Sequence, residues 1–188
     1  MKIAFVNGSP NKNGSISLLI KMLKENLSGC EFTDISAEDA VLSAKYPFCN
    51  VCSSPCSAAC YKGTALEKAF DEITSSDFVI FGSPTYFGAV SAQLKAFFDK
   101  SRRIRDGRLW LNKPMAVLSS GTSKYGGQQA VVRDIQDMAL VQGMTIVGDS
   151  GPLTGMGHLG VSMQRGVVDE YTQNRIKALA ERILMFKK

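Results

Sequence analysis

The chain has 188 residues and a mass of 20.4 kDa, a size that suits a single domain. Hydrophobic residues make up 45% and charged residues 21% of the sequence, which is typical of a globular protein and excludes an intrinsically disordered chain. No apolar run approaches the ~18 residues of a membrane-spanning helix. The apolar run from Ile3 to Val6 is also too short for the core of a signal peptide. We therefore expect an uncleaved cytoplasmic protein that does not bind membranes.

The net charge is a modest +5, from 22 Lys and Arg residues against 17 Asp and Glu residues. The densest basic stretch, Lys100 to Arg108, also contains Asp106 and follows Asp99. We interpret this stretch as a solvated helix end and loop rather than a nucleic-acid interface. A weaker alternative is that its cations help to hold an anionic cofactor or substrate.

Short β-type apolar runs alternate with runs at helical spacing along the whole chain. In chain order they predict a strand at 2–6, a helix at 15–27, a strand at 31–36, a helix at 64–74, a strand at 77–82, a helix at 91–102, a strand at 113–119, a helix at 128–142, a strand at 144–147 and a helix at 168–186. Five strands alternating with helices favour an α/β fold with a doubly wound parallel sheet, for which the commonest five-stranded order is 2-1-3-4-5. We expect one domain over residues 1–188. A Cys-rich insert at about 45–63 and a Gly-rich stretch at 148–166 depart from this minimal pattern.

The loop after the first predicted strand is rich in Gly, amides and hydroxyls and leads into a helix. Because the amides at a helix N-terminus attract anions, this loop is a candidate phosphate cradle. A helix cap made by Ser15 is the simpler interpretation, and the two are compatible. The loop is not a nucleotide-binding P-loop, because no Lys-Ser or Lys-Thr pair follows Gly14. The single G-x-G-x-x-G match, at Gly155 to Gly160, is interpreted as chance because no long helix follows it directly.

Two further loops are expected at the same edge of the sheet, where ligands of such folds bind. The loop after the third strand, GSPTYFG at residues 82–88, places Pro and two aromatic residues where a flat ring could lie against backbone amides. The loop after the fourth strand, SSGTSKYGGQ at residues 119–128, is long, polar and Gly-rich, and could cover the other side of such a ring. A turn with core aromatics and a flexible surface loop are the respective alternatives.

With these motifs together, the sequence resembles the NADPH-dependent FMN reductase family of flavodoxin-like proteins over nearly its whole length. The segments NGSPNKNGS, GSPTYFGAVSAQLKAFFD and SSGTSKYGGQ carry the resemblance, and the second is the most specific. The resemblance implies a flavodoxin-like fold that binds FMN. The Cys-bearing insert is similar to that of the iron–sulfur flavoproteins of the same superfamily.

The resemblance assigns the FMN contacts to three sets of residues. The first loop is implied to surround the phosphate through Ser9, Asn11, Ser15, Ile16 and Ser17. The isoalloxazine ring is implied to contact Pro84, Thr85, Tyr86, Phe87 and Gly88 on one side and Ser120, Gly121, Thr122, Tyr125 and Gly126 on the other. The family often has Arg in place of Asn11 and Thr in place of Ile16, so this chain lacks one charge and one hydroxyl of the usual phosphate site. No catalytic side chain is implied, because the redox chemistry belongs to the cofactor.

Four of the five cysteines fall within twelve residues, at Cys49, Cys52, Cys56 and Cys60. In a cytoplasmic chain such a group favours metal binding or redox activity over a structural disulfide. A 4Fe–4S cluster is the first interpretation, followed by redox-active thiols that form disulfides and then by zinc. The spacing of two, three and three intervening residues differs from the iron–sulfur flavoprotein pattern, which has a longer last gap.

The sequence thus predicts an FMN-dependent oxidoreductase that takes hydride from NAD(P)H and passes electrons to a small molecule or a redox protein. The alternative is an electron-carrier flavoprotein without a substrate of its own. We expect a homodimer or homotetramer that binds no nucleic acid.

Overall fold

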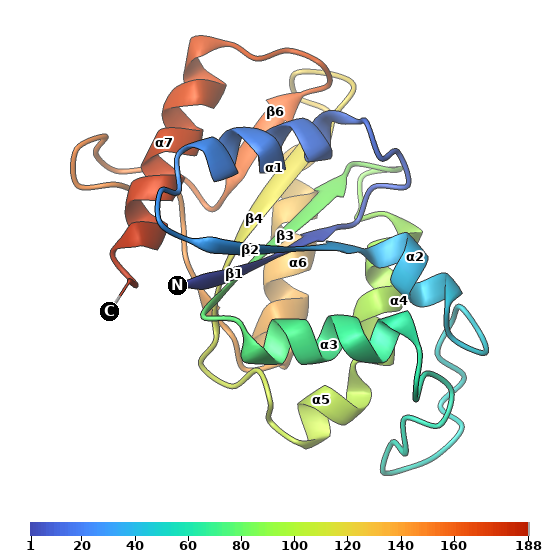
Figure 1. Ribbon diagram of the computed structural model, residues 1–188. Helices are drawn as coiled ribbons and strands as arrows, with labels where there is room; N and C mark the ends of the chain where they lie inside the picture. The colour runs from blue at the N-terminus through green and yellow to red at the C-terminus, as the bar shows by residue number, and fades with distance from the viewer. Residues whose placement is uncertain (188) are drawn as a thin grey trace.

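The computed structural model describes residues 1–187, which form a parallel sheet with helices on both faces (Figure 1). The strands are β1 (Lys2–Asn7), β2 (Glu31–Ser36), β3 (Phe78–Pro84), β4 (Pro114–Gly121), β5 (Thr145–Ile146) and β6 (Val161–Gln164). The helices are α1 (Ser15–Glu25), α2 (Ala37–Leu42), α3 (Ala65–Ser75), α4 (Ala92–Lys100), α5 (Arg102–Asp106), α6 (Gln128–Val141) and α7 (Glu170–Leu184). The strand order β2-β1-β3-β4-β5 confirms the predicted doubly wound fold, and β6 pairs with β4 as an additional strand.

Two apolar cores lie on opposite faces of the sheet. On one face α1 and α7 pack against the sheet through residues such as Leu19, Leu23 and Leu179. On the other face α2, α3, α4 and α6 bury a larger group that includes Phe70 and Trp110. The central strand β3 is buried over Phe78–Ser83, as its run of apolar residues predicts for a strand covered on both faces.

The edge of the sheet beside β4 differs from the prediction. The predicted fifth strand is only the two-residue β5, which pairs with Pro114 and Met115 at the start of β4. The chain then leaves the sheet and returns as β6, which pairs in parallel with Leu118–Gly121 at the end of β4. Residues 161–164 alternate between buried and half-buried, a period-2 pattern present in the sequence but masked by the surrounding Gly residues. The edge of the sheet beside β4 is therefore made of two short strands, β5 and then β6, and the Gly-rich stretch contains the chain between them and β6 itself.

Other local expectations are corrected. The short helices α2 and α5 were not predicted, and the last helix begins at Glu170 rather than at residue 168. The N-cap of α1 is Gly14 and not Ser15. The basic stretch is not fully solvated, because Lys100 is only 2% exposed.

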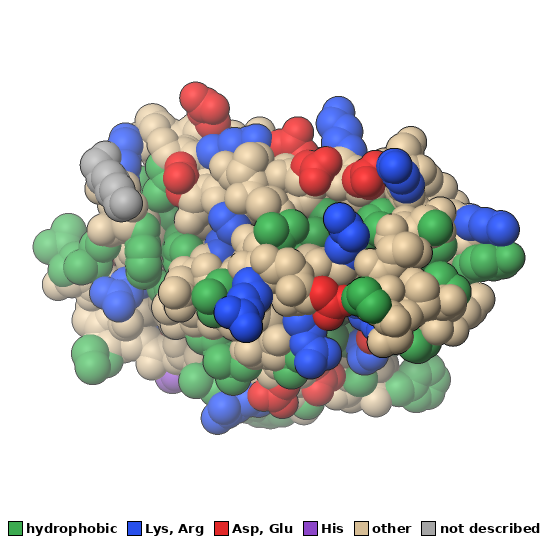
Figure 2. Space-filling view, turned by 90° about the horizontal axis from the view of Figure 1, so that it is seen from below, with side chains coloured by type: hydrophobic (Ala, Val, Ile, Leu, Met, Phe, Trp, Pro, Cys, Tyr) green, Lys and Arg blue, Asp and Glu red, His purple; other side chains and the backbone are tan. Residues whose placement is uncertain are grey.

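The surface on the side of α3 and α5 carries mixed charge. In Figure 2, Lys and Arg side chains on this face are interspersed with Asp and Glu side chains. Some charges of the surface are paired, such as the exposed Lys95 and Asp99, which lie 2.6 Å apart. No helix within residues 1–187 combines the length and apolarity needed to cross a membrane.

The N-terminus of α7 offers a test of local stability. The Asp169 side chain accepts hydrogen bonds from the Thr172 amide and hydroxyl at 2.8 and 2.7 Å, and these hold the pKa of Asp169 below its ordinary value of 3.8.

We predict that Asp169→Ala lowers the free energy of unfolding at pH 7 by about 1 kcal/mol, equivalent to roughly 2–4 °C in Tm. Asp169→Asn, which keeps an acceptor, should lose much less. Because the folded pKa is the lower one, the Asp169→Ala deficit should shrink as the pH falls below 3.8. Thermal unfolding between pH 7 and pH 3 measures both effects, and equal losses for the two variants would contradict the cap.

Candidate functional site

The loop between β1 and α1 forms a rigid turn in front of an uncapped helix. The Asn7 side chain accepts a hydrogen bond from the Ser9 amide at 2.9 Å, and the Ser9 hydroxyl accepts one from the Asn11 amide at 3.1 Å. Gly14 provides no capping side chain, and the first turn of α1 contains no acidic residue. Within the described chain, the amides of residues 15–17 have no hydrogen-bond acceptor. Three free donors and the positive end of the helix dipole therefore lie together at this helix N-terminus, as in phosphate-binding loops.

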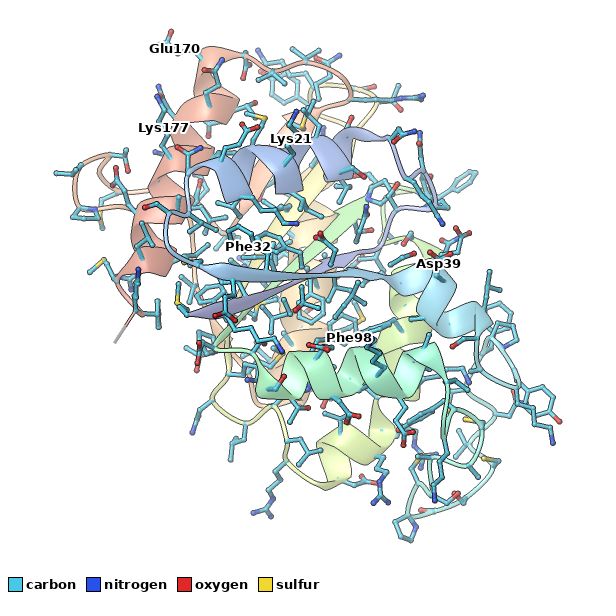
Figure 3. The ribbon with its side chains drawn as sticks, viewed as in Figure 1. Lys21, Phe32, Asp39, Phe98, Glu170 and Lys177 are labelled. Atoms are coloured by element: carbon cyan, nitrogen blue, oxygen red, sulfur yellow. The ribbon has the colours of Figure 1, made fainter. Side chains whose placement is uncertain are left out.

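The only lysine of this loop is directed elsewhere. Lys12 lies 3.0 Å from Asp39, which stands at the start of α2 in Figure 3. The hydrogen bond from Lys12 holds the pKa of Asp39 below its ordinary value. Lys12 is thus paired with a carboxylate and is absent from the lining of the cavity described next.

A small polar cavity of about 130 Å³ lies at the carboxyl ends of the strands. Its lining consists of Ser9, Asn11, Gly14, Ser15, Pro84, Thr85, Tyr86, Ser120, Gly121, Thr122 and Arg165. The Thr85 hydroxyl oxygen is buried in this lining and has no hydrogen-bond partner. A buried hydroxyl without a partner costs free energy, so it points to a missing polar ligand.

The loop after β3 presents two aromatic side chains on a tight turn. The amide of Tyr86 donates to the carbonyl of Ala89 at 3.0 Å, and the reverse bond measures 3.1 Å. The two residues between them, Phe87 and Gly88, both have positive φ, of 51° and 79°. A positive φ is unfavourable for Phe, and its side chain is fully exposed. These aromatics are therefore not core residues, and a strained, exposed aromatic at a ligand-binding edge indicates function.

The loop after β4 lies against the loop after β3. The Thr85 amide donates to the Ser120 carbonyl at 2.7 Å, which joins the two strand ends. A Cβ at Gly121 would lie 2.9 Å from the Gln128 side chain, so a larger residue at this position would require that side chain to move. Tyr125 is almost fully exposed beyond this contact.

The structure brings together nine of the fifteen residues predicted to bind the cofactor. Six lie outside the lining of the small cavity, namely Ile16, Ser17, Phe87, Gly88, Tyr125 and Gly126. The Ile16 side chain is buried in the core, so only its amide is available. The Ser17 hydroxyl already donates to the Lys12 carbonyl at 2.6 Å and accepts from the Asn7 side-chain amide at 3.0 Å. The other four belong to the exposed parts of the two loops.

Two residues of the lining were missed by the sequence analysis. Gly14 was recognised only as part of the loop, although its missing side chain leaves the helix uncapped. Arg165 directly follows β6, and it could not be placed because that strand was not predicted. The regular alternation of residues 161–164 was the only available signal.

Comparison with known proteins identifies the family. The family model for NADPH-dependent FMN reductase matches residues 1–158. The chain belongs to this family. An iron–sulfur flavoprotein of Methanocaldococcus jannaschii is 32% identical over the full length of both chains, and one of Archaeoglobus fulgidus is 30% identical over 98% of this chain and 94% of its own. A WrbA-like flavodoxin from Agrobacterium tumefaciens has the same fold, with a TM-score of 0.71, 17% identity and coverage of 99% of this chain and 97% of its own.

The cavity of this FMN reductase family member fits the FMN phosphate. The free amides of α1 and the unpartnered Thr85 hydroxyl are suitable partners for an anionic group, and the Ser9 hydroxyl donates only a long bond of 3.4 Å to the Asn11 carbonyl. The cavity volume of about 130 Å³ suits a phosphate and part of its chain rather than a whole flavin. The ring would extend along the exposed loops, where Tyr86 and Phe87 lie.

The four clustered cysteines do not form a preassembled metal site. Their thiols are free, and within residues 1–187 no three His, Cys, Asp or Glu side chains are arranged to hold a metal ion. The predicted ligand set of Cys49, Cys52, Cys56 and Cys60 is therefore not brought together. The segment is fixed instead to the α4–α5 region, where Arg102 donates to the Ser53 carbonyl at 3.2 Å.

The surroundings of Cys56 and Cys60 nevertheless suit an anion. The buried Lys100 ammonium has the Cys60 sulfur, 3.6 Å away, as its only hydrogen-bond partner in the described chain and forms no ion pair there. The Tyr61 hydroxyl is buried without any partner. Burial, and then the charges of Cys56 and Cys60, raise the pKa of Tyr61 above its ordinary value. A buried ammonium whose single partner is a thiol and a buried hydroxyl without any partner thus lie at this segment, and that donor set fits sulfur in an anionic form.

The unpartnered hydroxyl of Thr85 gives a test with two readouts. We predict that Thr85→Val leaves the free energy of unfolding of the cofactor-free protein unchanged or raises it by about 1 kcal/mol, because it removes an unsatisfied group. The same change should weaken FMN binding about 5- to 10-fold, because a hydrogen bond to the ligand is lost. Urea unfolding and fluorescence titration measure the two effects.

Thr74→Val is the matched control. The Thr74 hydroxyl donates to Phe70 at 2.8 Å and accepts from Trp110 at 3.1 Å, so its loss should destabilise the protein without changing FMN affinity. If Thr85→Val behaved like Thr74→Val, the hydroxyl would have a structural role only.

Proposed function

We propose that the protein is an FMN-dependent oxidoreductase that uses NAD(P)H as the electron donor. The observation that carries the proposal is the meeting, in one cavity, of the uncapped α1 N-terminus with the buried, unpartnered hydroxyl of Thr85. A free helix N-terminus and an orphaned donor are what a bound phosphate would satisfy. Membership of the FMN reductase family supports the same ligand.

Different residues would bind different parts of the cofactor. Ser9, Ser15 and the amides of residues 15–17 would hold the phosphate, and Thr85 would donate a hydrogen bond beside it. The exposed turn at Tyr86–Gly88 would support the ring from one side and the loop at residues 120–126 from the other. When bound, FMN would accept electrons from a reduced nicotinamide and pass them to an acceptor, which is chemistry that the cofactor supplies.

A groove next to the aromatic turn has room for a second molecule. It measures about 770 Å³ and is lined mainly by apolar side chains, including Tyr86, Phe87, Val90 and Met138. Asp134 at its side accepts a hydrogen bond from the Val90 amide at 3.3 Å and so ties α6 to this loop. An open apolar groove beside the ring position suits either the nicotinamide of the donor or a flat acceptor.

Anaerobic mixing of the FMN-loaded protein with NADPH or NADH tests the proposal. Rapid bleaching of the flavin absorbance would support an enzyme. Reduction by a protein donor alone would support the alternative, an electron carrier. Failure of the purified protein to bind FMN would refute both. Cytoplasmic location and assembly as a homodimer or homotetramer stay predictions, and analytical ultracentrifugation would test the second.

Gly88 offers a test of where the ring lies. A side chain at Gly88 would meet no protein atom within 4 Å, but its φ of 79° disfavours any other residue. We predict that Gly88→Val weakens FMN binding at least 10-fold, because it adds both strain and bulk where the ring must approach. Gly63→Val is the matched control, since Gly63 has a φ of 75° and equally open surroundings away from the cavity. Flavin affinity that is equal for the two variants would show that the ring lies elsewhere.

We further propose that the Cys-rich segment binds an iron–sulfur cluster, which would require its thiols to converge. The two buried donors beside Cys56 and Cys60 favour an anionic sulfur centre. The full-length relatives named iron–sulfur flavoproteins support the same assignment. Iron, sulfide and zinc analysis of anaerobically purified protein distinguishes the cluster from zinc and from redox-active thiols. Flavin bands without iron or sulfide would refute it.

A substitution of Lys100 tests this second proposal without an activity assay. We predict that Lys100→Met leaves the metal-free protein as stable or more stable, because it removes a buried charge that has no counter-ion. The same variant should retain less than half the iron of the wild type after gel filtration. Lys95→Met on the same helix removes an exposed ammonium and should change neither quantity. Full iron retention by Lys100→Met would mean that the ammonium does not stabilise a cluster.

A further inference from the structure

We infer that Arg165, which directly follows β6, supplies the positive charge of the FMN phosphate site. The inference rests on the proposed function, since it assigns a further residue to the same cofactor. It starts from the composition of the cavity lining, in which Arg165 is the only cation and no acidic residue occurs.

The position of Arg165 is fixed by backbone contacts on both sides. The Arg165 amide donates to the Gly121 carbonyl at 2.7 Å, which extends the pairing of β6 with β4 by one residue. The next amide, of Gly166, donates to the hydroxyl of Ser15 in the first turn of α1 at 3.0 Å. The end of β6 is therefore joined both to the loop after β4 and to the helix N-terminus that would bind the phosphate.

The contact with Gly166 also orients the Ser15 hydroxyl. Because its oxygen accepts from the Gly166 amide, its own proton remains free to donate. No acceptor for that proton occurs in the described chain. The turn that follows β6 thus leaves the Ser15 hydroxyl free to donate and places Arg165 in the lining of the same cavity.

The charge of Arg165 is free for a ligand. Its guanidinium is exposed and takes part in none of the ion pairs of the described chain. The other cation near the loop, Lys12, is paired with Asp39. Asn11, where the resemblance leads one to expect an Arg, is neutral and uses its side chain to accept from the Asn13 amide at 3.1 Å. Arg165 is the residue left to neutralise a phosphate dianion.

Comparison of FMN with riboflavin, which lacks the phosphate, isolates this role. The cofactor-free full-length protein is titrated with each flavin in turn, and flavin fluorescence is recorded at low and high salt. Arg165→Gln should weaken FMN binding about 10- to 100-fold, the usual worth of a charge-assisted hydrogen bond. Riboflavin binding should change less than twofold. The salt dependence of FMN binding should decrease, because a partly exposed charge pair is screened by salt.

Two further variants complete the experiment. Arg165→Lys keeps the charge but not the two-pronged geometry, so it should recover part of the lost FMN affinity. Arg182→Gln on α7 removes an equal charge outside the cavity and should bind both flavins like the wild type.

Each other outcome overturns the inference in a distinguishable way. Unchanged FMN affinity in Arg165→Gln, in a protein that binds FMN, would show that the guanidinium does not reach the phosphate. Equal losses for FMN and riboflavin would show that the residue only supports the fold of the loop. Absence of FMN binding by the wild type would refute the proposed function together with the inference.

Discussion

A close contact between the residue after β1 and the backbone of β3 sets the geometry of the whole site. The Gly8 amide donates to the Gly82 carbonyl at 2.7 Å, and a Cβ at Gly8 would lie only 2.8 Å from that oxygen. On the other side of β3, a Cβ at Gly82 would lie 2.6 Å from the Ile16 side chain, so α1 rests directly on the strand. Side chains at these two positions would push the phosphate loop and α1 away from the sheet. Both glycines are therefore required for the three loops to meet around one cavity.

Much of this arrangement can be predicted from the sequence, because it depends on local patterns. The apolar runs predict five strands of a parallel sheet, and the predicted order is the commonest one for such a sheet. The carboxyl ends of β1, β3 and β4 then place three polar loops at one edge, so most of the cavity lining can be named beforehand. The position of the three loops follows from the period of the apolar residues, whereas the individual lining residues were named from the resemblance to the FMN reductase family.

The features that escaped prediction depend on contacts between distant segments. The short strand β6 has just four residues, and its neighbour in the sheet is β4, about 40 residues earlier. Nothing in a four-residue alternation specifies that partner. The burial of Lys100 was missed for a related reason. A lysine at a helix end is normally solvated, and the contact of its ammonium with Cys60 joins segments 40 residues apart. Likewise, the missing cap of α1 becomes informative only when the free amides are seen to face a cavity.

The interrupted edge of the sheet connects stability with the site. The chain between β5 and β6 is held to α7 by Asp149, which is fully buried and lies 3.6 Å from Arg175, and by Glu181, which accepts from the Leu153 amide at 3.2 Å. The same excursion delivers β6 to the end of β4 and, through the Gly166 amide, to Ser15 on α1. Helices α1 and α7 share one apolar core. The segment that leads to Arg165 is held to α7, so it also supports α1, whose N-terminus would bind an anion. A phosphate bound between α1 and Arg165 would join an early and a late segment of the chain, so the protein should be more stable to unfolding with its cofactor than without it.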